Sequence, residues 1–324
     1  MKRLRAPAAL CLLLTACNES SPSTLDPSGP AAQRIERLWW ILLAIASVVF
    51  VTVVALMLYS IVKRRRDSGS TDDDRWGERM IAIGGVAVPT VILAVVFFIS
   101  LGDIRFLSND PGDDALRVEV EGRLWWWEIR YPGTDAVTAN EIHIPVGEPV
   151  VLELTTDDVI HSVWIPQLQA KTDMIPGRTN EMTIEADEPG TYRGQCAEFC
   201  GLQHAKMAFV VIAEQRDAFD RWLATEASSR AVPGDRQAEE LYLISSCAGC
   251  HAIRGTPATS DRGPDLTHLA SRVTLAAGTL TNTRDNLTRW IRDPQSIKPG
   301  ADMPPAELTS DELRILVDYL EALR

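Results

Sequence analysis

The sequence predicts three consecutive units: a two-helix transmembrane hairpin, an all-β sandwich or barrel domain, and an all-α domain. Two apolar runs, residues 39–62 and 80–101, are each long enough to cross a hydrocarbon core roughly 30 Å thick. Short stretches of β-forming residues, separated by turn signals such as Pro-Gly, follow between residues 116 and 213. The chain ends with a helical stretch at residues 310–323.

The first residues have the pattern of an export signal. A basic start, Met1-Lys-Arg-Leu-Arg5, precedes an apolar stretch at residues 8–16 that is too short to span a membrane. Leu14-Thr-Ala-Cys17 resembles a bacterial lipobox. This predicts a lipoprotein-type signal peptide at residues 1–16, cleavage before Cys17 and lipid on that residue. The alternative is an ordinary leader with an incidental cysteine.

The two apolar runs predict membrane helices over residues 39–62 and 80–101, joined by a loop at residues 63–79. This loop contains Lys63-Arg-Arg-Arg66, and the positive-inside rule therefore places it in the cytoplasm. The segment 17–38 and everything after residue 101 then lie outside the cell membrane. Pro89, within the second run, is tolerated where neighbouring helices cover the freed backbone, which is weak evidence for a larger membrane partner.

Residues 102–227 are predicted to form the β domain, closed by a helix at residues 214–227. The predicted strands span residues 116–121, 124–131, 141–146, 149–155, 180–186, 191–196 and 207–213. A Pro-Gly-containing polar stretch predicts a linker at residues 228–236. Residues 103–232 hold 23 acidic and 11 basic residues. This charge excludes nucleic acid as a partner and favours a basic one, although solubility alone explains it equally well.

The loop Cys196-Ala-Glu-Phe-Cys-Gly-Leu-Gln-His-Ala-Lys-Met207 combines two thiols, an imidazole and a thioether. Structural zinc sites usually use paired Cys-x2-Cys knuckles without methionine. A thioether beside thiolate and imidazole indicates copper electron transfer. Cysteines four residues apart can bridge two metal ions, so the loop predicts a copper pair. His161 is the best candidate for a further ligand from elsewhere in the fold.

A second motif, Cys247-Ala-Gly-Cys250-His251, has the spacing used for covalent attachment of a c-type haem. The alternative, a redox-active dithiol, is typical of a βαβ context, whereas helices are predicted here. With Cys11 and Cys17 in the leader, each of the six cysteines has a separate role and none is left for a disulfide.

Three motifs together resemble subunit II of the haem-copper cytochrome c oxidases. They are His161-Ser with Trp164-Ile-Pro166, Lys171-Thr-Asp-Met-Ile-Pro-Gly-Arg178, and the loop from Cys196 to Met207. The resemblance runs from the first membrane helix to about residue 213 and implies a cupredoxin-like Greek-key barrel or sandwich. It also implies a binuclear copper centre, CuA, bridged by both cysteines.

The resemblance further implies that His161 and Met207 serve one copper, and that His204 and the backbone carbonyl of Glu198 serve the other. The Glu198 side chain is expected to reach a magnesium ion shared with the catalytic subunit. Asp173 and Arg178 are expected to contact that subunit.

Other expectations from the resemblance concern electron and proton entry. The segment Gly122-Arg-Leu-Trp125-Trp-Trp127 resembles the family's aromatic entry surface, with Trp125 at the entry position. The alternative is core packing, because alternate strand residues face opposite sides. Glu78 is either a proton-entry carboxylate, as in some relatives, or an interfacial charge. Met174 departs from the family, whose members usually have a small residue there.

Residues 237–324 resemble a small class I cytochrome c. The resemblance implies thioether bonds from Cys247 and Cys250 to the haem, and iron ligation by His251 and Met303. The carbonyl of Pro264 would accept the other imidazole proton of His251 and so fix the orientation of the ring.

The fusion of both domains resembles subunit II of the caa-type oxidases. It implies a two-pass protein of the bacterial inner membrane, with both soluble domains on the periplasmic face. Its expected partners are oxidase subunits I and III and cytochrome c or another periplasmic donor. Its expected role is to pass electrons from haem c through CuA to the subunit that reduces oxygen to water and pumps protons. Two alternatives remain: the corresponding subunit of a membrane nitric oxide reductase, and a membrane-bound copper carrier for assembly.

Overall fold

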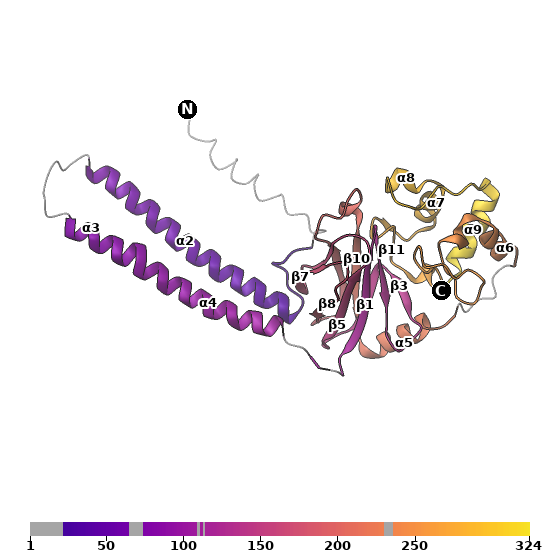
Figure 1. Ribbon diagram of the computed structural model, residues 1–324, viewed down its shortest axis with the longest axis horizontal. Coiled ribbons are helices and arrows are strands. Elements are labelled where there is room, and N and C mark those ends of the chain that lie inside the picture. The colour runs from indigo at the N-terminus through magenta and orange to yellow at the C-terminus, as the bar shows by residue number, and fades with distance from the viewer. Residues whose placement is uncertain (1–21, 65–73, 109–110, 113, 230–235) are drawn as a thin grey trace, which may run out of the picture.

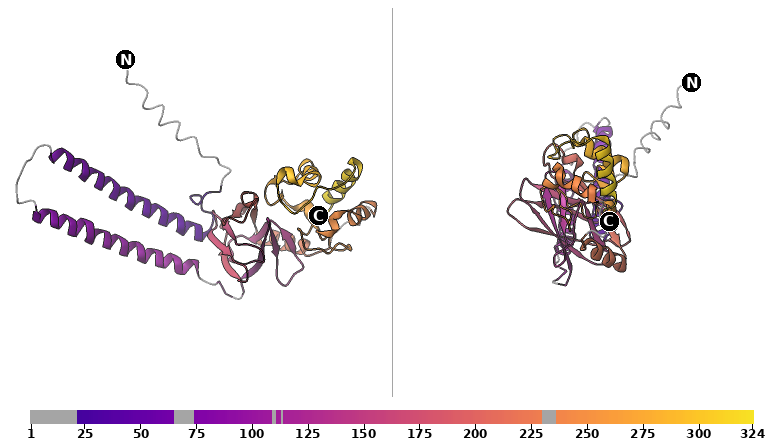
Figure 2. Two further views of the ribbon diagram at one scale, coloured as in Figure 1. Left: turned by 45° about the horizontal axis from the view of Figure 1, so that its top comes forward. Right: turned by 90° about the vertical axis from the view of Figure 1, so that its right-hand side faces the viewer.

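A helical hairpin, a β-sandwich and a helical domain make up the molecule. The structure is a computed structural model that describes residues 22–64, 74–108, 111–112, 114–229 and 236–324. The hairpin and the helical domain lie on opposite sides of the sandwich (Figures 1 and 2). This arrangement confirms the predicted fold class. The predicted signal peptide, Cys17, and most of the predicted loop and linker lie outside the described residues.

The hairpin pairs two helices that are long and apolar enough to cross a membrane. The first is α2 (Pro30–Arg64), and the second runs through α3 (Asp74–Met80), the π-helix η2 (Ile81–Ala87) and α4 (Val88–Leu107). The π-helical turns come directly before Pro89, which cannot donate to the preceding turn and crowds its carbonyl groups. Wider turns at such a position are a common way to accommodate a proline within a helix.

The first helix begins at Pro30, well before the apolar run, because its first turns contact protein rather than lipid. Asp103 of α4 is buried and accepts hydrogen bonds from Arg34 (3.2 Å) and Arg37 (3.0 Å) of α2. The Arg34 guanidinium also lies 3.8 Å from the ring centre of Phe106. These contacts join the two helices at the end nearest the sandwich. Hydropathy marks only the lipid-facing part, so the sequence did not predict this extension.

The sandwich consists of two five-stranded sheets with the core between them. The first sheet has the order β3-β2-β1-β5-β8, and the second has the order β4-β10-β9-β6-β7. The strands are β1 (Leu116–Arg123), β2 (Trp126–Arg130), β3 (Val137–Ala139), β4 (Glu141–Pro145), β5 (Val150–Thr156), β6 (His161–Ile165), β7 (Gln169–Met174), β8 (Asn180–Ile184), β9 (Gly190–Cys196) and β10 (Ala208–Glu214). Two pairs, β1 with β5 and β4 with β10, are parallel, and the others are antiparallel. Parallel neighbours require crossover connections, as in Greek-key sandwiches.

Three strands of the sandwich were not predicted: β3, β6 and β7. β3 has three residues, and β7 carries the polar run Lys171-Thr-Asp173, so neither shows a hydrophobic alternation. β6 is buried at four of its five positions and begins with His161, a residue that pattern reasoning treats as a polar loop residue. The predicted closing helix is present as α5 (Arg216–Glu226).

The C-terminal domain is built mainly from helices around its own core. Its elements are α6 (Arg236–Ile244), η4 (Ser246–Gly249), η5 (Leu269–Ser271), β11 (Thr274–Leu275), β12 (Leu280–Thr281), α7 (Arg284–Arg292), α8 (Pro294–Ile297) and α9 (Ser310–Glu321). A capping box between Thr309 and Glu312 fixes the start of α9. The two-residue strands β11 and β12 form a small hairpin that no sequence signal predicted.

The sandwich and the C-terminal domain meet at a polar interface. The buried Glu141 of β4 accepts hydrogen bonds from the backbone N–H groups of Val273 (2.7 Å) and Thr274 (3.1 Å). The backbone N–H of Ala208 donates to Ala277 across the same boundary (3.0 Å). Such bonds need fixed relative positions of the two backbones, so the domains pack in one defined orientation.

Burial raises the pKa values of two carboxyl groups at this interface. It raises the pKa of Glu141 to about 7, although Arg272 and the two amide bonds oppose the shift. It also raises the pKa of Glu226 to about 7, against the attraction of Arg272 and Arg254. Both carboxyl groups therefore bind protons more tightly in the folded chain than in the unfolded chain.

The raised pKa of Glu141 predicts that the protein loses stability as the pH rises and this carboxyl group ionises. This loss is absent below the ordinary pKa of 4.5 and complete above about pH 7, because the folded state must then hold a buried charge. Glu141→Gln keeps an acceptor oxygen and removes that charge. We expect the variant to gain on the order of 1–3 kcal/mol of unfolding free energy over the parent chain between about pH 5 and about pH 8. Denaturant unfolding of the detergent-purified chain measures this difference. Glu188→Gln, at an exposed turn, is the matched control. A difference that stays constant with pH would contradict the assignment.

Candidate metal and haem sites

The ends of three strands bring the predicted metal ligands together at one end of the sandwich. β6 begins with His161, β9 ends with Cys196, and β10 begins directly after Met207. Cys200 and His204 lie in the loop between β9 and β10. His161, Cys196, Cys200 and Met207 are each at most 5% exposed. The rigid strands therefore hold a buried set of soft ligand atoms.

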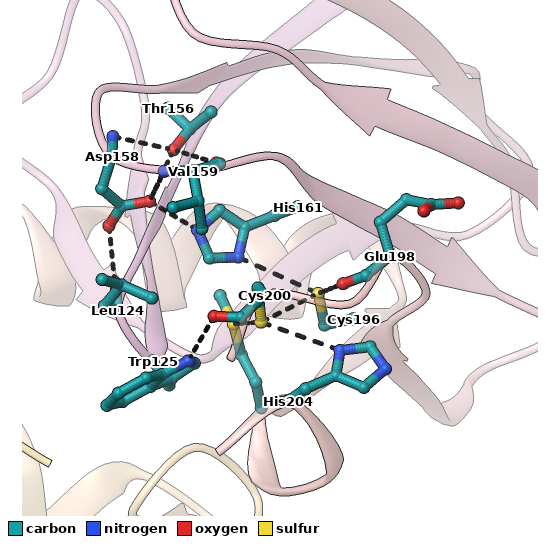
Figure 3. Close-up of polar contacts among 11 residues, drawn as sticks. Leu124, Trp125, Thr156, Asp158, Val159, His161, Cys196, Glu198, Cys200 and His204 are labelled. Carbon is teal, nitrogen blue, oxygen red and sulfur yellow. Dashed lines mark hydrogen bonds and ion pairs between the residues drawn. The ribbon is translucent and has the colours of Figure 1, made fainter. Parts of the chain in front are cut away.

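The ligand atoms surround two sulfur atoms (Figure 3). The Sγ atoms of Cys196 and Cys200 are 3.7 Å apart, and both thiols are free. His161 Nδ1 lies 3.9 Å from Cys196 Sγ, and the carbonyl oxygen of Glu198 lies 3.2 Å from the same sulfur. The second sulfur, Cys200 Sγ, lies 3.7 Å from both His204 Nδ1 and Met207 Sδ. Each sulfur thus has its own pair of further donors.

Local backbone contacts fix the shape of the loop. The N–H of Cys196 donates to Met207 and that of Ala197 donates to Ser162, which ties both ends of the loop to the sheet. Gly201 has a φ of +110°, a conformation open to glycine, and the ring of Trp125 packs against it. A side chain at Gly122 would lie 3.0 Å from the His161 ring. Glycine at this position leaves room for the imidazole.

Asp158 holds the imidazole of His161 from behind. Its Oδ1 lies 2.7 Å from His161 Nε2, which leaves Nδ1 pointing toward the sulfurs. Burial lowers the pKa of His161, but the hydrogen bonds with Asp158 and Cys196 outweigh it and raise the pKa to about 9. A carboxylate behind a histidine is the usual support of a metal ligand. Asp158 was not predicted from the sequence, although its place three residues before a candidate ligand was a usable signal.

The two cysteines share their protons unequally. The hydrogen bond between them lowers the pKa of Cys196, and the same bond with burial raises the pKa of Cys200. Metal ligands must be deprotonated, so binding here releases the proton that Cys200 retains and the proton of His161. Two thiolates, two imidazoles and a thioether in a buried pocket suit copper better than zinc or magnesium.

The outer side of the loop carries exposed charges. The Glu198 carboxylate pairs with Lys171, which also lies 3.4 Å from Asp173. Arg178 is exposed in the turn after β7. Met174 is fully buried and pairs with His161 in the β6–β7 register. It therefore contributes packing behind the site and not an exposed group.

Trp125 lies between the two domains and the metal loop. Its indole Nε1 donates to the carbonyl of Cys200 at 2.8 Å. Trp127, two residues further on, is 1% exposed and packs in the sandwich core against Phe209. The aromatic segment thus has one residue in the core and one against the metal loop. Glu78, by contrast, is exposed on α3, far along the chain from both sites.

The second site lies in the C-terminal domain around the Cys247 to His251 motif. The N–H groups of Cys250 and His251 both donate to the carbonyl of Cys247, which forms a compact turn. His251 Nδ1 lies 2.8 Å from the carbonyl oxygen of Pro264, so Nε2 is left to act as a ligand. A Cβ on Gly263 would lie 2.7 Å from the imidazole ring, so glycine is required there. This arrangement fits a histidine oriented for iron.

Met303 lies in the segment between α8 and α9 and is partly buried. Gln295 donates to its backbone carbonyl (2.9 Å) and to that of Ala301 (2.8 Å), which shapes this segment. Gly263 and Gln295 were not singled out from the sequence. The Gly-Pro pair at residues 263–264 was the available signal for the first, and no signal marked the second.

Comparison with known families identifies both soluble domains. Residues 134–214 match the family model of the cytochrome c oxidase subunit II periplasmic domain, and residues 236–324 match that of cytochrome c. With two membrane helices ahead of them, these domains define a membrane-anchored electron-transfer subunit of the copper- and haem-containing class.

Similarity to whole proteins identifies the family. Cytochrome c oxidase subunit 2 of Alkalihalophilus pseudofirmus is 35% identical over 97% of this chain and 95% of its own length. The Bacillus subtilis subunit 2 is 29% identical over 98% of this chain and 96% of its own length. The chain belongs to the cytochrome c oxidase subunit II family. It is a membrane-anchored oxidase subunit with a periplasmic domain, and it associates with other oxidase subunits.

A solved structure from the same family was also found. The periplasmic domain of subunit II of cytochrome oxidase from Bradyrhizobium japonicum is 30% identical. It covers 36% of this chain and 95% of its own length, with a TM-score of 0.34.

The contact between Asp158 and His161 generates a prediction. Asp158→Asn weakens the support of the imidazole, and loss of such a support typically lowers metal affinity by about 10–100-fold. We expect copper to be lost to a competing chelator at correspondingly lower chelator concentrations. A competition titration of the purified protein, followed through copper absorbance, measures the change. Asp157→Asn replaces the exposed neighbouring carboxylate and should leave the titration unchanged. Equal affinity in both variants would rule out this role for Asp158.

Proposed function

We propose that this chain is the electron-entry subunit of a terminal respiratory oxidase. Electrons enter at the C-terminal domain and pass to the loop from Cys196 to Met207, which we call the copper loop. They then leave toward a haem-copper catalytic subunit that reduces oxygen to water with proton pumping. The observation that carries the proposal is that four further donors lie within 3.9 Å of the Sγ atoms of Cys196 and Cys200, in the chain that also holds the Cys247 to His251 motif.

The copper site is proposed to be a binuclear CuA centre. Cys196 and Cys200 would bridge the two ions, with His161 and Met207 serving one and His204 and the Glu198 carbonyl serving the other. Sharing one electron over two bridged ions changes each bond length little, so transfer needs little rearrangement. The distances group the donors differently, because Met207 lies near Cys200 together with His204. If each sulfur held both ions, nearness to one sulfur would not decide which ion a donor serves, so both groupings remain compatible with the proposal.

Haem c is proposed to be bound through thioethers from Cys247 and Cys250, with His251 and Met303 as iron ligands. A bound haem of this kind supplies one-electron chemistry at a potential raised by methionine ligation. The role of the chain is to orient the imidazole through Pro264 and to keep the haem close to the copper loop. Because the two domains belong to one chain, transfer between them is intramolecular and independent of protein concentration.

Several further roles complete the proposal. Trp125 is the residue through which electrons enter the copper loop, and its hydrogen bond to the carbonyl of Cys200 supports this role. Glu198 contributes its carboxylate to a shared magnesium ion, with Lys171 as its partner in the isolated chain. Asp173 and Arg178 contact subunit I, which fits their exposure beside the loop. Glu78 is either a proton-entry carboxylate or an interfacial charge, and its exposure on α3 fits both.

The proposed setting is the bacterial inner membrane, with Cys17 lipidated and subunits I and III as neighbours. Cytochrome c or another periplasmic donor supplies the electrons. A copper carrier is the weaker alternative, because carriers exchange metal through accessible ligands whereas His161 is fully buried. The corresponding subunit of a nitric oxide reductase would carry the same copper site, so only the substrate of the complex distinguishes that alternative from an oxidase.

The proposal is tested by purifying the complex from native membranes. We expect haem c and binuclear copper spectra in this subunit, and consumption of oxygen with reduced cytochrome c as donor. Consumption of nitric oxide, with no consumption of oxygen, would support the reductase alternative. Finding zinc or a single copper ion in the loop after full reconstitution would contradict the proposed centre.

The proposed role of Glu198 generates a separate prediction. Glu198→Gln retains the backbone carbonyl, so we expect the near-infrared copper absorbance to remain, while magnesium or manganese binding at the border weakens. Absorption spectra and metal analysis of the purified complex measure both. Met207→Leu, which removes a thioether ligand, is the positive control and should change the copper spectrum. Loss of the copper spectrum in a folded Glu198→Gln protein would contradict ligation by the carbonyl.

A further inference from the structure

The copper loop contacts a short segment of the C-terminal domain, residues 297–299, which we call the docking segment. Gln203 Nε2 donates to the carbonyl of Pro299 (2.5 Å), and Lys206 Nζ donates to that of Ile297. Lys298 Nζ donates in the opposite direction, to the carbonyl of Trp125 (2.6 Å). Three consecutive residues are therefore joined to the sandwich, and two of the three bonds come from the copper loop itself.

Lys298 is unusual among these contacts because it is only 3% exposed. Lysine is almost never fully buried unless its ammonium group is paired. Here its partners are two backbone carbonyls, those of Trp125 and of Ala276 at 3.4 Å. Burial lowers the pKa of Lys298 to about 7. A burial this costly at a domain boundary indicates a positional role, because a hydrophobic side chain would fill the same space at lower cost.

Lys298 also lies between the two proposed redox sites. On one side, its acceptor Trp125 donates through the indole to Cys200 at 2.8 Å. On the other side, Gln295 binds both Gly300 and the carbonyl of Met303. A continuous series of hydrogen bonds and short chain segments thus connects the proposed iron ligand, the docking segment, Trp125 and a proposed copper ligand.

We propose that Lys298 is a positioning residue that holds the C-terminal domain in one register against Trp125 and the copper loop, and so sets the rate of electron transfer between the two sites. The inference rests on the proposed haem and copper relay and adds a residue that the relay itself does not require. Electron transfer slows steeply as the distance between redox centres grows. A small loss of register is therefore enough to slow transfer without altering either centre.

The test uses the purified holo-oxidase complex. The attached haem c is reduced by a light pulse with a ruthenium photoreductant, and its reoxidation by the copper site is followed from both absorbances. In Lys298→Met, which has a similar length but no donor, we expect transfer to slow roughly tenfold or more, because the donor that joins the docking segment to the Trp125 carbonyl is removed. Lys298→Arg, which keeps a donor, should recover part of the rate.

Two further measurements separate position from general damage. The midpoint potential of haem c should be unchanged in Lys298→Met, since none of its ligands is altered. The copper potential is measured as well, because Lys298 interacts through its charge with Cys200. Hydrogen exchange at the Ala208 amide should accelerate, because this amide donates to Ala277 across the boundary. Arg314→Met removes a positive charge from an exposed face of α9 and should leave rate, potentials and exchange unchanged.

Each contrary result has a distinct meaning. Transfer at the parent rate in Lys298→Met overturns the role of Lys298 and leaves the relay intact. Slowing that the measured change in driving force fully accounts for also overturns it, because the effect then lies in the potentials and not in the position of the domain. Failure of photoreduced haem c to reduce copper in the parent protein overturns the proposed function, and the inference with it.

Discussion

The structure depends on holding two buried thiol groups close together without a disulfide bond between them. Cys196 and Cys200 lie with their sulfurs 3.7 Å apart in a pocket that excludes most solvent. Two features support this geometry: the sheet pins both ends of the loop, and Asp158 fixes His161 from behind. The energetic cost of a buried, deprotonated donor set is offset only when a cation is bound there. The sandwich is therefore best understood as a rigid frame that keeps these ligands in place.

Main-chain groups of both domains form much of the contact between the sandwich and the C-terminal domain. The bonds from Lys298 to Trp125, from Lys206 to Ile297 and from Ala208 to Ala277 all end on backbone carbonyls. Backbone acceptors cannot be moved by rotamer changes, so a donor that reaches one fixes a position more exactly than a pair of mobile side chains does. The interface consequently specifies orientation through geometry more than through complementary charge.

The sequence predicted the parts of the molecule that are encoded locally. Both apolar helices, most strands, the metal loop and the haem motif each occupy one continuous stretch, and chemistry or periodicity marks them directly. The start of α2 at Pro30, the strand around His161 and the support from Asp158 depend on contacts between distant segments. The domain interface was missed for the same reason, because a carbonyl acceptor such as that of Trp125 leaves no trace in residue identity. Family resemblance supplied the pairing of ligands, which spacing alone could not.

The acidic charge of the sandwich is best explained by where it lies. Alternate residues of β1 and β2 place three glutamates on the outer face of the first sheet: Glu119 is exposed, Glu121 is half-buried, and Glu128 is buried beneath its arginine partners. Arginines neutralise much of this face: Arg123 pairs with Glu121 and Glu128, and Arg117 pairs with Glu153 and Glu181. Paired charges cancel at short range and project little field beyond a Debye length of about 10 Å. The glutamates of this face therefore serve solubility and cross-strand pairing, and any steering of a basic donor has to come from the unpaired acids elsewhere on the surface.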